Sequence, residues 1–273
     1  MAEKIPGDRI KLEGKRNIRD LGGYRTVDGR RIRPHRLIRS ENLSGLTEND
    51  IRILTREYEL RTIVDFRTLA EAMEKPDPVM EGVNYIHNPV LSEAQMGMTH
   101  EEKTENFGLL RFLVDLIQTD SDGPEHFMSD MYAQLVTEEY TLKQYRHFFE
   151  LLLCQEEGSL LWHCSAGKDR AGTGAILILY ALRVPGETIR EDYLLTNRYL
   201  EQDLERMLGM LSAKIPDPKV LEGVRIMNTA RESYLERLLD TVTETYGSMD
   251  EFLKTQMGIG KEEHRILRDR YLM

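Results

Sequence analysis

Residues 163–170 read His163-Cys164-Ser165-Ala166-Gly167-Lys168-Asp169-Arg170. They stand between a short apolar run at 159–162, typical of a strand, and a helical pattern at 171–182. Backbone N–H groups converge on an anion where a strand turns into a helix N-terminus. A helix N-terminus and nearby cations also lower the pKa of a cysteine thiol from about 8.5 to between roughly 3.5 and 7.5. The stretch therefore predicts a phosphate-binding loop with its own nucleophile, the thiolate of Cys164.

Arg170 is the second residue on which this interpretation depends. It falls in the first turn of the expected helix, and its planar guanidinium can hold two oxygens of a phosphoryl group during transfer. Lys168 adds a point charge at the mouth of the loop. The alternative is an inert, buried Cys164 beside a surface arginine. It does not explain why a glycine, a lysine, an aspartate and an arginine gather at one turn.

The chain is acidic overall, which bears on its partners. Its 273 residues carry a formal net charge of −10, and 40% of them are hydrophobic. This composition is typical of a globular protein and argues against nucleic acid as a partner. The attraction for an anionic substrate must then be local. The basic residues expected around the loop are Arg36, Arg39, Arg67, Lys168 and Arg170.

The cysteines and the N-terminus indicate a reducing compartment. Only two cysteines occur, Cys154 and Cys164, which excludes a disulfide scaffold and a zinc site built on thiolates. Cys154 lies in a helical pattern before the loop strand, where we expect a buried structural cysteine rather than a resolving thiol. Residues 1–6 lack an apolar signal core, and no run reaches the roughly 18 apolar residues of a membrane span. We therefore expect a cytoplasmic protein without integral membrane association.

The remaining pattern predicts an α/β fold with a mainly parallel central sheet flanked by helices. The expected strands lie at 36–39, 61–66, 83–90 and 159–163. A helical pattern at 47–57 begins at Thr47, which can cap it, and residues 24–32 predict a hairpin that turns at Asp28-Gly29. Further helical patterns follow the loop at 187–211, 218–246, 248–257 and 261–271.

We interpret residues 1–273 as a single domain with two helical additions. One is an insertion at about 92–139, ahead of the loop strand, and the other is a C-terminal extension at about 199–273. The segment before the loop strand is longer than a crossover between parallel strands needs. It predicts either a mobile lid over the site or an ordinary pair of packing helices, and both interpretations stay open.

Three further segments carry motifs in a fixed order. They are Asn17-Ile18-Arg19-Asp20-Leu21-Gly22-Gly23-Tyr24, Ile63-Val64-Asp65-Phe66-Arg67 with Glu71, and Asp192-Tyr193-Leu194-Leu195-Thr196-Asn197. Together with the loop they resemble a bacterial tyrosine-phosphatase-like family, cysteine-based phosphatases with an N-F-R-D-L-G-G-Y opening and an H-C-x-x-G-K-D-R loop. The resemblance spans roughly residues 10–200. It implies a cysteine-phosphatase fold and two-step hydrolysis without a metal or cofactor.

The resemblance also implies roles for the loop residues. Cys164 attacks phosphorus and becomes a phosphocysteine, which water then hydrolyses to release phosphate. The backbone N–H groups that hold the phosphoryl oxygens belong to Ser165, Ala166, Gly167, Lys168, Asp169 and Arg170.

Three aspartates are candidates for the general acid that protonates the leaving oxygen. Asp169 is the first choice, because the family motif places it inside the loop. Asp65 is the second, at the end of a strand expected beside the loop strand, and its alternative role is to orient Arg67 or Arg170. Asp20 is a weaker third, since a turn before the two glycines that follow explains it.

Other residues of the motifs have supporting roles or none assigned. His163 precedes the nucleophile along a strand, so its side chain should point away from bound phosphate, and we expect it to orient the loop and tune the thiolate. Arg19 and Arg67 can either reach phosphate or hold carboxylates, and the two roles stay open. Asp192 and Asn197 are family markers without an assigned role.

The sequence departs from the family pattern at two positions. Ala171 stands where cysteine phosphatases usually carry Ser or Thr, whose hydroxyl hydrogen-bonds the departing thiolate. A hydrogen bond to a charged group is worth about 1.5 to 3 kcal/mol, so we predict slower breakdown of the phosphocysteine with activity retained. Thr173 points in another direction on the helix and is a doubtful substitute. Ile18 replaces an aromatic residue, which we expect to affect packing only.

Hydrolysis of phosphotyrosine in proteins, extending to phosphoserine and phosphothreonine, is the leading prediction. A phenol, with a pKa of about 10, leaves more readily than the alkoxide of an inositol or serine. Lys168 also resembles a lysine of tensin-type phosphoinositide phosphatases that meets a second phosphate, so a phosphoinositide or inositol phosphate is the alternative substrate. A catalytically silent phosphate-binding module and a sulfurtransferase explain fewer of these residues.

Overall fold

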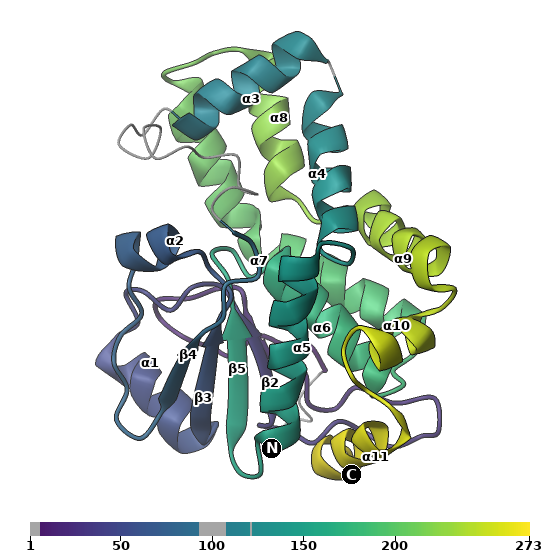
Figure 1. Cartoon of the computed structure of the whole chain (residues 1–273). Coiled ribbons are helices and arrows are strands. Elements are labelled where there is room, and N and C mark those ends of the chain that lie inside the picture. Colours follow the sequence, from purple (N-terminus) through teal and green to yellow (C-terminus); the bar gives the residue numbers. More distant parts are fainter. Residues whose placement is uncertain (1–5, 93–107, 121) are drawn as a thin grey trace.

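The computed structural model describes residues 6–92, 108–120 and 122–273. At its centre is a five-stranded sheet with the strand order β1-β2-β5-β3-β4 (Figure 1). The strands are β1 (Ile18–Asp20), β2 (Leu37–Ser40), β3 (Leu60–Asp65), β4 (Asn84–His87) and β5 (Ser159–His163). β1 pairs antiparallel with β2, and the other pairs are parallel, which confirms the mainly parallel sheet.

Both faces of the central strands are buried. In β5, Leu160 and Trp162 pack into one hydrophobic core and Leu161 into the other, and in β2 Leu37 and Ile38 divide in the same way. Successive side chains of a strand point to opposite faces, so a strand covered on both sides is an unbroken apolar run. This is why the loop strand was recognisable in the sequence.

Helices cover both faces of the sheet. The pattern at 47–57 forms α1 (Glu48–Arg52), followed by a π-helical turn (Ile53–Glu57), and Thr47 caps α1 as predicted by accepting from the Asp50 backbone N–H at 3.1 Å. The others in the body of the fold are α2 (Leu69–Glu74), α5 (Glu139–Cys154), α6 (Arg170–Ala181), α10 (Met249–Thr255) and α11 (Lys261–Tyr271). α6 follows the loop directly and is almost entirely buried.

A second group of helices lies beyond the carboxyl ends of the parallel strands, as Figure 1 shows for α3, α4 and α8. Its members are α3 (Gly108–Thr119), α4 (Gly123–Gln134), α7 (Gly186–Ser212), α8 (Pro218–Asn228) and α9 (Glu232–Tyr246). α3, α4 and α7 all contact α8, so the insertion and the C-terminal region share one layer. Residues 93–107 and 121 of the insertion lie outside the described residues, and a lid movement stays a prediction.

The helix expected at 218–246 is divided into α8 and α9, and Asn197 of α7 supplies the reason. Its side-chain amide donates to the Ala230 carbonyl at 2.8 Å, and its carbonyl accepts from the Ala230 N–H at 2.7 Å. An amide that satisfies both backbone groups of one residue replaces the hydrogen bonds that a continuing helix would give them. Asn197, which had no assigned role, therefore fixes the junction between α8 and α9.

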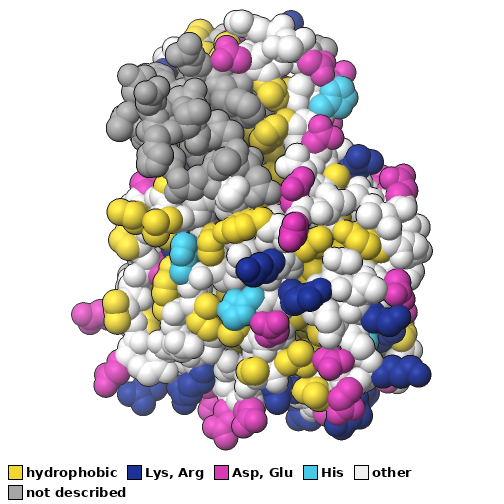
Figure 2. Space-filling model, in the orientation of Figure 1, with side chains coloured by type: hydrophobic (Ala, Val, Ile, Leu, Met, Phe, Trp, Pro, Cys, Tyr) yellow, Lys and Arg dark blue, Asp and Glu magenta, His cyan; other side chains and the backbone are white. Residues whose placement is uncertain are grey.

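The predicted hairpin at 24–32 is present, with the Ile32 N–H donating to the Tyr24 carbonyl at 2.9 Å and Gly29 at a φ of 87°. None of the described helices has the length and apolar character that crossing a lipid bilayer requires. Figure 2 shows basic and acidic side chains interspersed over the face that it presents. On this face, cations do not gather into one extended patch, in keeping with a local site for an anion.

Candidate active site

The loop between β5 and α6 has its carbonyl groups turned outward. Each of three of these carbonyls accepts a side-chain hydrogen bond of 2.8 Å. The donors are the Asn42 amide to Ser165, the Asn17 amide to Ala166 and the Arg39 guanidinium to Gly167. The N–H groups of residues 165–168, in contrast, donate to no protein acceptor in the described chain. Converging free N–H groups at a helix N-terminus form an anion cradle.

Gly167 is required by the packing of this loop. Its φ of +71° lies in the left-handed region, and a Cβ there would be 2.6 Å from the Ser40 carbonyl oxygen and 2.7 Å from the Glu41 nitrogen. The loop therefore lies directly against the end of β2, and a larger residue would push it away.

Arg170 is held by Glu71 of α2 through two parallel bonds of 2.6 and 2.7 Å. Burial favours the neutral form of each group, but their mutual hydrogen bonds and charges outweigh it. They lower the pKa of Glu71 to about 2, and they raise the pKa of Arg170, to which the Cys164 charge also contributes. The guanidinium is thus fixed and fully charged beside the buried Cys164 thiol.

Glu71 is the functional residue to which the sequence gave no role. Its carboxylate also accepts from the Ser165 hydroxyl at 2.5 Å and from the Thr68 backbone N–H at 2.9 Å. The second bond belongs to a capping box, in which the Thr68 hydroxyl accepts from the Glu71 N–H at 3.3 Å. The Thr-x-x-Glu spacing was a readable signal for a helix start, but not for a contact with Arg170.

Asp169 occupies the N-cap position of α6, but its side chain makes no capping hydrogen bond. Instead, its Oδ1 lies 2.8 Å from the Lys168 ammonium and accepts from the Tyr132 hydroxyl at 2.8 Å. The Lys168 side chain is only 3% exposed and faces the Thr229 carbonyl and the Tyr234 ring. The point charge expected at the mouth of the loop is therefore turned inward. A lysine so placed is poorly situated to meet a second phosphate of a substrate.

Asp65 is surrounded by donors. Its carboxylate accepts from the Arg67 guanidinium at 2.7 Å and from the Tyr85 hydroxyl at 2.7 Å, and it faces His163 Nδ1 at 3.8 Å. Burial raises the pKa of Asp65, but the bonds from Arg67 and the charge of His163 outweigh it and lower the pKa. These contacts favour the alternative role of a carboxylate that orients Arg67 over that of a proton donor.

His163 is fully buried between Asp65 and a second carboxylate, Asp77, whose Oδ2 lies 2.8 Å from His163 Nε2. Asp77 had no role in the sequence. Asp65, Asp77 and His163 have the mutual spacing of a metal site. Arg67 already pairs with both carboxylates, at 2.7 and 3.0 Å, so a cation of the chain itself is bound to this cluster.

Arg19 and Arg39 converge on Asp192 of α7. Arg19 Nε lies 2.9 Å from Asp192 Oδ1, Arg39 Nη1 lies 2.6 Å from Oδ2, and all three residues are buried. Burial alone would raise the pKa of Asp192, but the two guanidinium groups lower it to about 2. Arg39 also holds the Gly167 carbonyl, so Asp192 supports the loop through Arg39, and Arg19 holds a carboxylate.

Other expectations for single residues are resolved as follows. Asp20 closes the predicted turn by accepting from the Gly22 N–H at 2.8 Å. Arg36 was wrongly placed near the loop, because its guanidinium bonds the Gln155 and Glu156 carbonyls before the start of β5. Cys154 was expected to be buried and is exposed at the end of α5, near the opposite end of β5 from Cys164.

Ala171 is fully buried, and its carbonyl accepts from the Trp162 indole N–H at 2.9 Å. Thr173 is also buried, and its hydroxyl has no hydrogen-bond partner among the described residues. Slower breakdown of the intermediate stays a prediction.

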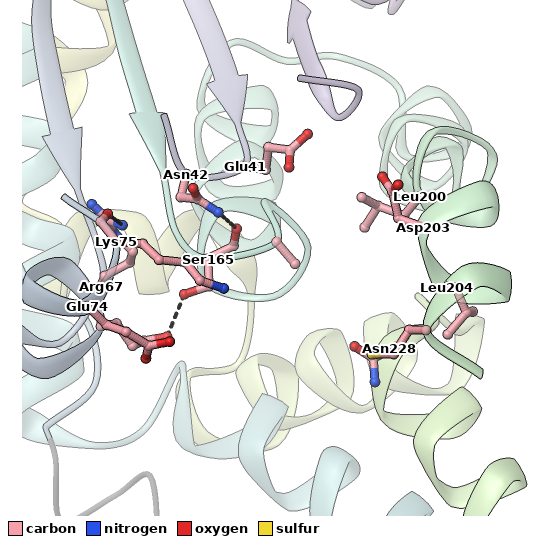
Figure 3. A pocket seen from close by; sticks show the side chains of 13 residues that line it. Glu41, Asn42, Arg67, Glu74, Lys75, Ser165, Leu200, Asp203, Leu204 and Asn228 are labelled. Atoms are coloured by element: carbon pink, nitrogen blue, oxygen red, sulfur yellow. Dashed lines mark hydrogen bonds between the residues drawn. The ribbon is translucent and has the colours of Figure 1, made fainter. Parts of the chain in front are cut away.

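A pocket of about 500 Å³ opens beside the loop. Ser165, Ala166 and Asn42 line one side, and apolar side chains of α7, Leu200, Leu204 and Met207, line another. Figure 3 shows Leu200 and Leu204 across the pocket from Ser165. The pocket therefore joins the polar loop to a wall of mostly apolar side chains, with Asp203 among them, and this wall suits an aromatic ring.

The sheet, the cradle and the buried thiol together place the protein among the cysteine-dependent phosphatases. Comparison with known proteins agrees, because residues 10–273 match the model of the tyrosine phosphatase family. The chain belongs to this family, as its motifs predicted, and is a phosphatase.

Relatives are spread over several bacteria. A protein of Cupriavidus necator named as a tyrosine-protein phosphatase is 29% identical over 263 residues, which cover 94% of this chain and 85% of that protein. The triple specificity protein phosphatase PtpB of Mycobacterium tuberculosis is 28% identical over 261 residues, covering 89% and 92% of the two chains. A tyrosine-protein phosphatase of Nostoc commune is 27% identical over 164 residues, covering 60% and 49%.

Proposed function

We propose that this chain hydrolyses phosphotyrosine in proteins through a phosphocysteine formed on Cys164. The observation that carries the proposal is the loop of residues 165–168, whose N–H groups have no protein acceptor in the described chain and lie in the same loop as the buried thiol and the clamped Arg170. The family and the names of the relatives favour phosphotyrosine over a phosphoinositide. The name of PtpB extends the expected substrates beyond phosphotyrosine. The proposal includes a cytoplasmic location, where a reducing environment keeps the thiol active.

The reaction proceeds in two displacements at phosphorus. The Cys164 thiolate forms a bond to phosphorus while the bond to the phenolic oxygen breaks, and Asp169 gives its proton to that oxygen. Water then attacks the phosphocysteine, the Asp169 carboxylate takes a proton from the water, and the thiolate leaves. The loop N–H groups and Arg170 hold the equatorial oxygens in both steps. The apolar wall of the pocket receives the phenyl ring, and the phosphate product remains bound in the loop until it dissociates.

The test is hydrolysis of a phosphotyrosine peptide and of a simple aryl phosphate. We expect activity that vanadate inhibits and chelators do not, and that falls on the order of 10³-fold or more in Cys164→Ser. Cys154→Ser is the matched control and should retain activity, because Cys154 is exposed at the end of α5. Hydrolysis that survives in Cys164→Ser would contradict the mechanism. A phosphoinositide preferred over the peptide in kcat/KM would contradict the substrate class.

A further inference from the structure

A side chain from the insertion reaches the proposed acid. Tyr132 of α4 is fully buried, and its hydroxyl donates to Asp169 Oδ1 at 2.8 Å. Tyr193 of α7 donates in turn to the Tyr132 hydroxyl, also at 2.8 Å. Two tyrosines from different helices thus form a hydrogen-bonded chain that ends on the carboxylate of the phosphate loop.

Aromatic neighbours fix the direction of the Tyr132 hydroxyl. The Tyr132 ring stacks on Tyr234 of α9, with centroids 5.4 Å apart, and meets the edge of Tyr193 at 6.1 Å. Burial, followed by the charge of Asp169, raises the pKa of Tyr132 well above its usual value of 10.0. The hydroxyl therefore keeps its proton and remains a donor throughout the working range of the enzyme.

The two oxygens of Asp169 are left in different environments. Oδ1 receives both the Tyr132 hydroxyl and the Lys168 ammonium, whereas Oδ2 has no donor within the described part of the chain. A carboxyl group anchored through one oxygen can present the other, with its proton, in a fixed direction.

We propose that Tyr132, supported by Tyr193, is a positioning residue that aims the acid Asp169 at the leaving oxygen, so that the insertion supplies part of the catalytic apparatus. This inference rests on the acid role given to Asp169 under the proposed function. It differs from a lid role, because the contact is made in the structure as it stands.

The effect on pH dependence can be isolated because the substitution at Tyr132 changes no charge near Asp169. The groups that face it are Cys164, Lys168 and Arg170 of the loop, Tyr132 of α4, Tyr145 of α5, Tyr193 of α7 and Tyr234 of α9. Burial is the largest cause that raises the pKa of each of these tyrosines, so all four stay neutral. Replacing Tyr132 by Phe removes one donor without changing a charge.

The experiment compares pH profiles of kcat on a phosphotyrosine peptide. In Tyr132→Phe we expect kcat to fall about tenfold with KM unchanged, and the alkaline limb to move up by about one pH unit, because the acid keeps its proton to higher pH once a donor is lost. Tyr193→Phe should shift the limb in the same direction by less. Tyr246→Phe, which removes a bond to the Val136 carbonyl just after α4, is the matched control and should leave the limb in place.

An alkaline limb that stays in place in Tyr132→Phe, with folding confirmed by its unfolding midpoint, overturns the proposal. If Tyr132→Phe does not fold, an unchanged limb in Tyr193→Phe overturns it instead. Asp169→Asn is measured in the same series to separate the two levels of inference. If Asp169→Asn keeps the limb, the acid assignment itself fails. If Asp169→Asn abolishes the limb and Tyr132→Phe leaves it unmoved, only the role of Tyr132 fails.

Discussion

Glu71 performs two tasks with one carboxylate. It closes the capping box that starts α2 through the Thr68 N–H, and it holds both arms of the Arg170 guanidinium. The start of a short helix therefore sets the position of Arg170, the group that we propose binds phosphate. Because the pKa of Glu71 is lowered to about 2, against burial, by Arg170 and Ser165, this support stays charged at every pH at which the enzyme can work.

We predict that Glu71→Gln lowers kcat/KM about 10- to 100-fold. Glutamine can still accept the capping-box bond, but it loses the charged bonds to Arg170, which are worth about 1.5 to 3 kcal/mol each. Thr68→Ala is the matched control, since it removes the cap hydroxyl and keeps the carboxylate. It should cost about 1 kcal/mol in the free energy of unfolding and leave kcat/KM nearly unchanged. Equal losses of activity in the two variants, measured by steady-state kinetics, would refute this role of Glu71.

The site residues that could be predicted from the sequence are those that lie close together along the chain. Cys164 and Arg170 stand in one short loop, so their spacing alone indicated the site. Tyr132 and Asp77 are far from the loop in sequence, and ordinary core or turn residues explain them equally well until the fold brings them to Asp169 and His163. Burial explains the error at Lys168, because a lysine beside a loop is usually exposed.

At the scale of elements, a buried cluster of charges ties the edge of the sheet to α7. Arg19 in β1 and Arg39 in β2 both bond Asp192, and Tyr24 of the hairpin donates to it at 3.0 Å. Two cations and one anion are thus desolvated together, which is costly to disturb because the partner groups cannot reach water. Through Arg39 and the Gly167 carbonyl, this cluster sets the distance between the sheet and the phosphate loop.

We predict that Asp192→Asn lowers the free energy of unfolding by about 3 to 5 kcal/mol at pH 7, because it leaves buried guanidinium groups without their counter-charge. The folded pKa of about 2 lies below the ordinary value of 3.8, so the ionised carboxylate stabilises the fold above pH 3.8 and this contribution is lost as pH falls through 2. The gap between wild type and variant should therefore shrink by about 1 kcal/mol between pH 7 and pH 3, where the folded carboxylate is still mostly ionised.

Urea unfolding at pH 7 and near pH 3 measures that gap. The contributions of the carboxylates that both proteins share cancel in the difference between their free energies of unfolding. Asp269→Asn serves as the control, because its bond to Arg265 is exposed and should be worth less than about 1 kcal/mol at either pH. A gap for Asp192→Asn that does not narrow in acid would show that its ionisation is not what stabilises the cluster.

Strands and helices could be predicted where their apolar residues follow one regular spacing in the sequence. The parallel strands are buried on both faces and read as apolar runs, and most helices are buried on one face and read as a helical repeat of apolar residues. β1 was not recognised as a strand, since Ile18–Asp20 is short and two of its residues are charged and buried in the Asp192 cluster or the turn. The break between α8 and α9 was missed for a similar reason, because Asn197 acts on it from another helix.

At the scale of the whole molecule, the C-terminus closes onto the N-terminal hairpin. Arg31 and Met273 exchange two backbone hydrogen bonds of 2.8 and 3.0 Å, and the Arg33 N–H donates to the Tyr271 carbonyl at 2.7 Å. Leu272 is buried in the same hydrophobic core as Trp162 of the loop strand. The last helix and the central sheet are therefore parts of one core, and the single domain stays a prediction.

A single domain predicts that one transition unfolds the sheet and the helices together. The chain contains one tryptophan, Trp162, which is buried in β5 against Phe148, so its fluorescence reports on the sheet, while far-ultraviolet circular dichroism reports mainly on the helices. We expect the two signals to share one urea midpoint. Leu272→Ala should lower the free energy of unfolding by about 2 to 5 kcal/mol and move both signals equally, since a cavity in a shared core weakens every element around it. A variant in which the circular dichroism shifts and the Trp162 signal does not would instead divide the C-terminal helices from the sheet as a separate folding unit.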